Sequence, residues 1–109
     1  MTEWDEMKAY VGFDDEVDGA RLRRFAPHAE GRLPWAVDRF YDAILQFEGA
    51  RSVLEDDAQV ERLKVTLKQW CRELLAGPWD MAYCERRRRI GHVHVRVGLP
   101  YRYMFTAMN

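Results

Sequence analysis

The sequence lacks the features that mark secreted, membrane and zinc-stabilised proteins. Its two cysteines, Cys71 and Cys84, form no CxxC pattern, which disfavours a structural zinc site. No apolar run approaches the roughly 18 residues that a membrane span needs, and the acidic opening segment MTEWDEMK has no apolar core of a signal peptide. We therefore expect a reduced, cytoplasmic protein that does not bind a membrane.

Two further absences concern function. The formal net charge of −1 disfavours a dedicated nucleic-acid-binding protein, which would normally be basic on one face. The chain also has no nucleophile elbow, no phosphate-binding loop and no pair of carboxylates that can be placed on one face. An enzyme activity within these residues is therefore not expected.

The 109 residues, 48% of them hydrophobic, are enough for one folded domain. Apolar residues recur at helical spacing between a few glycines and prolines, which predicts an all-α fold. Pro34 suits the first turn of one helix, Gly49 its end, and Gly77-Pro78 the end of the next. The expected helices are 13–32, begun by Asp14 or Asp15; 33–50; 56–77, begun by Asp56 or Asp57; 80–97; and the first turns of a fifth at 100–109.

The segment 92–97, HVHVRV, also alternates like a half-buried strand, which would place His92 and His94 on one face as a metal site. No other segment offers a partner strand. On a helix, in contrast, Ile90, Val93, His94 and Val97 share one apolar sector, and His92 lies on the far side with arginines. The helix is the better interpretation, and it directs His94 inward.

The apolar faces of three expected helices each include one polar residue: Tyr41, Thr66 and His94. Taken singly, each has an ordinary structural explanation: a packed tyrosine, a threonine bonded to its own helix and a core histidine. Taken together, they suit a flat hydrophobic cofactor held between helices with one imidazole as an axial ligand.

The segment RRRIGHVHVRVGLPYRYMFTAMN resembles the proximal-helix signature of the globin-coupled sensors, with the signature histidine at His94. VDRFYDAIL is similar to the family's second helix, where an F-Y pair, here Phe40 and Tyr41, supplies a distal tyrosine. VERLKVTLKQW is similar to the distal helix and matches at Leu63 and Thr66. The resemblance extends over nearly the whole chain and is most specific at 89–104.

This resemblance implies a globin-like fold that binds haem b, iron protoporphyrin IX, and senses O2 or another diatomic gas. His94 would be the iron ligand, with its Nδ1–H held by a carbonyl about one turn earlier. Tyr41 would donate a hydrogen bond to the bound gas, with Thr66 as a second donor and Leu63 as an apolar gate. Phe40 and Val97 would also line the cofactor. The signal would pass to a C-terminal transmitter module, such as a histidine kinase or a diguanylate cyclase.

The expected fifth helix is still apolar in pattern at Asn109, so we expect residues 1–109 to be the N-terminal part of the sensor domain. Two alternatives follow: these residues are a fragment, or a homodimer partner or second chain completes the fold. The arginine run 86–89 wraps around its helix and is expected to be solvated, although one member could pair with a haem propionate. Trp70 and Trp79 are expected to be core residues. The alternative function is a cofactor-free helical module for protein interaction or dimerisation.

Overall fold

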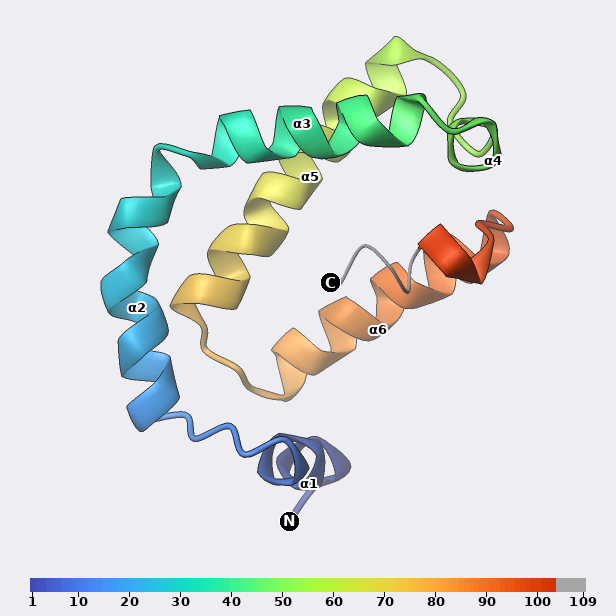
Figure 1. The fold of residues 1–109 in the computed structure, drawn as a ribbon. Helices are drawn as coiled ribbons and strands as arrows, with labels where there is room; N and C mark the ends of the chain where they lie inside the picture. Colours follow the sequence, from blue (N-terminus) through green and yellow to red (C-terminus); the bar gives the residue numbers. More distant parts are fainter. Residues whose placement is uncertain (104–109) are drawn as a thin grey trace.

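The computed structural model describes residues 1–103, which form six helices and, within that range, no strand (Figure 1). The prediction of an all-α fold is therefore confirmed. No helix in this part of the chain is long and apolar enough to cross a bilayer. The helices are α1 (Glu3–Tyr10), α2 (Val17–Glu30), α3 (Leu33–Leu45), α4 (Glu48–Arg51), α5 (Asp57–Ala76) and α6 (Met81–Arg96).

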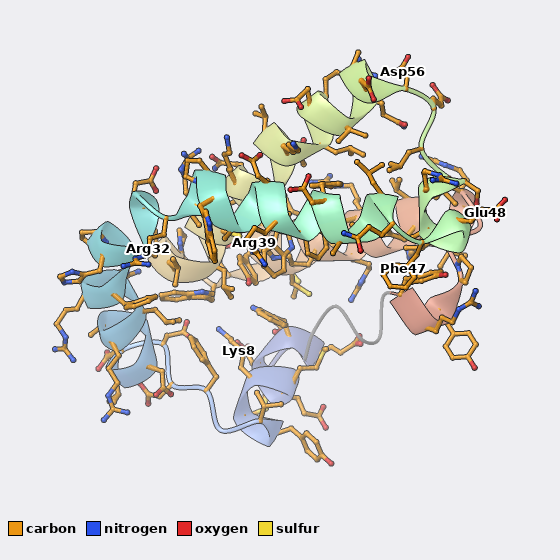
Figure 2. The ribbon with its side chains drawn as sticks, turned by 45° about the horizontal axis from the view of Figure 1, so that its top comes forward. Lys8, Arg32, Arg39, Phe47, Glu48 and Asp56 are labelled. Carbon is orange, nitrogen blue, oxygen red and sulfur yellow. The ribbon has the colours of Figure 1, made fainter. Side chains whose placement is uncertain are left out.

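Helices α5 and α6 begin at aspartates whose side chains cap them. Asp56, labelled in Figure 2, accepts a 2.8 Å hydrogen bond from the Gln59 amide, and Asp80 accepts one of 2.9 Å from the Tyr83 amide. Both satisfy backbone donors that a first helical turn leaves unpaired. Gly77 ends α5 with a φ of +67°, a conformation that glycine adopts without a side-chain clash. These starts and stops agree with the predicted ones.

Three predictions about the first half of the chain need correction. Helix α2 begins at Val17 rather than near residue 13, because the Asp14 carboxylate accepts from the amides of Glu16 and Val17. Helix α1 was not predicted, although Thr2 and Asp5 form a capping box at its start. The predicted helix 33–50 is divided, because Phe47 takes an extended conformation between α3 and α4.

Gly49 therefore has a different role from the predicted helix stop. A Cβ at this position would lie 2.7 Å from the Tyr103 hydroxyl oxygen, so glycine allows α4 to approach the chain that follows α6. That following segment is helical at residues 101–103. The rest of the predicted fifth helix lies outside the described residues.

Helix α5 is central to the packing, because it contacts both α2 and α3 extensively. Figure 1 shows α5 crossing behind α3 and running down toward the turn that leads into α6. The core cluster at the α3–α5 crossing consists of the buried Val37, Tyr41 and Val60, with partly buried Ile44, Leu54, Leu63 and Leu67 packed on it. The predicted apolar faces of α3 and α5 thus pack on each other.

Candidate functional site

The stretch 92–97 belongs to helix α6 and its C-terminal cap, so the alternative of a two-histidine strand is wrong. His92 is exposed and His94 is half-buried, as the helical register predicts. Residues 1–103 contain no group of three or more histidine, cysteine or acidic side chains that could hold a metal ion.

The imidazole of His94 has an unusual environment. Its Nδ1 atom is buried and has no hydrogen-bond partner among the described residues, so the expected bond to a carbonyl one turn earlier is not formed. Its Nε2 atom is not buried and makes no hydrogen bond within residues 1–103. A half-buried imidazole whose outer nitrogen is free suits a metal ligand.

Tyr41 lies at the centre of the core cluster, with only 9% of its surface exposed. Burial raises the pKa of its hydroxyl, and the positive charge of Lys64 opposes this effect in part. Lys64 is held beside α3 by a 3.2 Å ion pair with Asp38. The Tyr41 hydroxyl therefore remains protonated, and able to donate a hydrogen bond, throughout the physiological pH range.

The other predicted site residues do not all converge. Leu63 is partly buried against Tyr41 in the core cluster, and the Phe40 ring meets the Tyr41 ring edge-on at 5.4 Å between centroids. Thr66 is exposed, and its hydroxyl donates a 3.2 Å bond to the Arg62 carbonyl on its own helix. Val97 is 47% exposed at the C-terminal end of α6. Two groups result: Phe40, Tyr41 and Leu63 between α3 and α5, and His94 with Val97 on α6.

Thr66 also lines a hollow of about 450 Å³ between α5 and α6. Apolar side chains on both helices border this hollow, and among them Val65 and Val93 are 64% and 43% exposed. Leaving such residues uncovered costs free energy, so an apolar group seated against them would be favourable. The remaining lining residues are Gln69, Trp70, Glu73, Arg86, Arg87, Arg89 and Ile90.

The residues present fit a haem group in two respects. The half-buried imidazole of His94 has an Nε2 atom that makes no hydrogen bond within residues 1–103, and such a nitrogen is the kind of ligand that haem iron takes in globins. The uncovered valines on α5 and α6 offer an apolar surface for a flat ring. Of the residues that the sequence predicts for the cofactor, Thr66 borders the hollow between α5 and α6, and His94 lies one residue beyond its lining residue Val93 on α6.

The described fold places a half-buried histidine on α6 and a buried tyrosine on α3, and it matches the structure of a solved globin domain. The profile of the Protoglobin family matches residues 1–109, and the chain belongs to this family. The globin domain of a Geobacter sulfurreducens globin-coupled sensor superposes with a TM-score of 0.88 at 38% identity, covering 100% of this chain and 71% of that one. The resemblance to globin-coupled sensors is thereby confirmed.

Another relative is the heme-based aerotactic transducer HemAT of Halobacterium salinarum. It is 30% identical over 92 residues, which make up 84% of this chain and 19% of the relative. The present chain therefore spans about a fifth of that protein's length. These relatives are named as a sensor and a transducer, which places the family among signalling proteins.

Two residues near the site were not singled out from the sequence. Lys64 adjusts the pKa of Tyr41, and the guanidinium of Arg87 is stacked between Trp70 and Tyr83, 4.0 and 4.5 Å from the ring centroids. Arg87 was expected to be solvated with its neighbours, but it is half-buried. No sequence signal could have shown this, because the contact with Trp70 joins two helices whose spacing only the fold sets.

Proposed function

We propose that this chain is a haem-based sensor domain for O2 or another diatomic gas. The observation that carries the proposal is His94, the one histidine of three that is not exposed, with a buried nitrogen left unpartnered by residues 1–103. The similarity to HemAT, a heme-based aerotactic transducer, supports it. Residues 1–109 are taken as part of one globin-like domain, with haem b held through His94 Nε2.

When bound, haem supplies an iron centre that takes up small diatomic gases. The residues of the chain would bind the gas by hydrogen bonds, exclude water and cover the cofactor. Tyr41, whose hydroxyl keeps its proton, would donate a hydrogen bond toward a polar gas ligand. Thr66 would serve as the second donor once its hydroxyl turns away from the Arg62 carbonyl. Leu63 and Phe40 exclude water beside Tyr41, and Val97 covers the cofactor from α6.

The proposed role is sensing rather than catalysis, with the signal leaving through α6 and the chain after it to a C-terminal transmitter such as a histidine kinase. We further propose a cytoplasmic protein that acts as a homodimer or with a second chain that completes the fold. The close approach of Gly49 on α4 to Tyr103, in the chain that follows α6, supports a contact through which a change in α6 would reach α4.

An absorption spectrum tests the proposal directly. The purified protein is titrated with haem, reduced, and exposed to carbon monoxide. We expect a Soret band that forms at one haem per chain and shifts with the gas. A folded, helical protein that takes up no haem would favour the alternative, a cofactor-free module for protein interaction.

Replacing Tyr41 by phenylalanine is expected to raise the O2 dissociation rate constant by up to about tenfold, the equivalent of one neutral hydrogen bond of roughly 0.5–1.5 kcal/mol. Carbon monoxide, a less polar ligand, should be affected less. Stopped-flow or flash photolysis gives both constants. The control is Tyr10→Phe, because Tyr10 is 90% exposed on α1.

The pH dependence gives a second check on Tyr41. Because burial raises its pKa, the hydroxyl keeps its proton, and the O2 dissociation rate should stay flat from about pH 6 to 9. Since the folded-state pKa lies above the unfolded one, the associated stability is present below the unfolded pKa and is lost as the pH rises through the folded value. A dissociation rate that rises within this range, or is unchanged in Tyr41→Phe, would remove the assigned role.

A further inference from the structure

The guanidinium of Arg87 lies between α5 and α6 with part of its donor set unused. Its Nη2 donates a 2.9 Å bond to the Trp70 carbonyl, and its plane is covered by the rings of Trp70 and Tyr83. Its Nε and Nη1 atoms are buried and have no partner among the described residues. At least three of its five N–H bonds therefore lack an acceptor within residues 1–103.

Buried donors on a charged group are costly to leave unpaired, and a guanidinium cannot lose its proton to relieve the cost. The stacked rings stabilise the positive charge but accept no in-plane hydrogen bond. An oxygen acceptor at this position would therefore be stabilising. An anionic oxygen suits it best, because charge-assisted bonds to carboxylate or phosphate are about twice as strong as neutral ones.

The surroundings of Arg87 carry an excess of positive charge. Arg86, Arg87 and Arg89 all line the 450 Å³ hollow, and Glu73 is the acidic residue among its lining side chains. Glu73 is already paired with Arg86 at 3.3 Å, which leaves two guanidinium charges in the hollow without a carboxylate. Thr66 and Gln69 add further polar groups on the α5 side.

We propose that Arg87, supported by Arg89, forms a binding site for a small oxyanion, a carboxylate or a phosphate, in the hollow between α5 and α6. The anion comes either from solution or from a carboxylate side chain of haem. Only the second source rests on the proposed function; the first is independent of it. Either source gives Arg87 the acceptor that residues 1–103 do not supply.

The first test uses the haem-free protein and inorganic phosphate. Thermal unfolding is followed by circular dichroism in phosphate and in sodium chloride of equal ionic strength. Because a ligand specific to the folded state stabilises it, phosphate at ten times its Kd should raise the Tm by about 5 °C relative to chloride. Arg87→Met should remove this shift and Arg89→Gln should reduce it, whereas Arg32→Met, at the exposed junction of α2 and α3, should preserve it.

The second test identifies the source. Wild type and Arg87→Met are titrated with haem and with haem dimethyl ester, whose carboxylates are blocked. If haem supplies the anion, the ester binds wild type at least about tenfold more weakly, and the difference disappears in Arg87→Met. If the anion is free in solution, haem and its ester bind alike, and the phosphate-dependent Tm shift persists in the haem-loaded protein.

The two proposals fail in different ways. If the protein takes up neither haem nor the ester, the sensor function is wrong, and the phosphate experiment still decides the anion site. If phosphate raises the Tm of wild type and Arg87→Met equally, and blocking the haem carboxylates changes neither affinity, the anion site is wrong. Should Arg87→Met fail to fold, Arg89→Gln decides the same question, because Arg89 is exposed and outside the ring stack.

Discussion

Replacing Trp79 by alanine is expected to lower the free energy of unfolding by about 3–5 kcal/mol, the usual cost of removing a buried tryptophan. The Trp79 side chain is 4% exposed and lies against Gly19 on α2, where an added Cβ would be 2.5 Å from Cζ3 of the ring. Its Nε1 donates a 2.9 Å bond to the Leu74 carbonyl. The substitution would leave a cavity and an unpaired carbonyl together.

Trp79 also joins the N-terminal helix to the start of α6. Its carbonyl accepts bonds of 2.9 Å from Trp4 Nε1 and 2.8 Å from Lys8 Nζ, and the Phe13 ring meets the Trp79 ring edge-on at 5.4 Å. Lys8, labelled in Figure 2, lies on the side of α1 that faces the other helices. Loss of the indole should therefore remove the Phe13 contact and loosen the α2–α5 packing, whereas the backbone carbonyl that Trp4 and Lys8 bind remains in place.

Urea unfolding followed by circular dichroism measures this effect, with the free energy extrapolated linearly to water. The matched control is Trp35→Ala, because Trp35 is 63% exposed and its ring lies under the guanidinium of Arg39 on the same helix. The control should cost less than about 1 kcal/mol. Where Trp79→Ala does not fold, Trp79→Phe gives a smaller loss that can be measured. Equal stabilities for Trp79→Ala and Trp35→Ala would contradict the assigned role.

The local signals in the sequence were sufficient for the helices that position His94. Asp56, Gly77 and Asp80 act through bonds within a few residues of themselves, so their roles can be inferred without the fold. The inward direction of His94 followed from helical spacing in the same way. Helix α1 was missed although Thr2-x-x-Asp5 is a capping box, because its apolar residues show little periodicity.

The features that sequence reasoning missed depend on contacts between distant segments. The Arg87 guanidinium is stacked on Trp70, 17 residues away, and hydrogen-bonded to its carbonyl. Gly49 is required by the approach of Tyr103 rather than by the end of its own helix. The missing carbonyl partner of His94 Nδ1 has the same origin, since burial of that atom depends on the packing around α6.

Replacing His94 by alanine is expected to weaken haem binding by at least about 100-fold, because loss of a group that merely orients a metal ligand already costs 10–100-fold. His92→Ala should leave the affinity unchanged, since His92 is exposed and differs from His94 by two positions on α6. Haem titrations at the Soret band measure both affinities, with circular dichroism to confirm that each variant is helical.

A ligand role for His94 can be separated from a packing role by chemical rescue. In His94→Gly, the removed imidazole leaves space at a half-buried position, and free imidazole can then supply the missing nitrogen. We expect added imidazole to restore haem binding to His94→Gly and to have little effect on wild type. Rescue requires that the lost group was a ligand, because a variant that had merely lost packing would not recover. If His92→Ala loses haem and His94→Ala retains it, the assignment of the iron ligand is reversed.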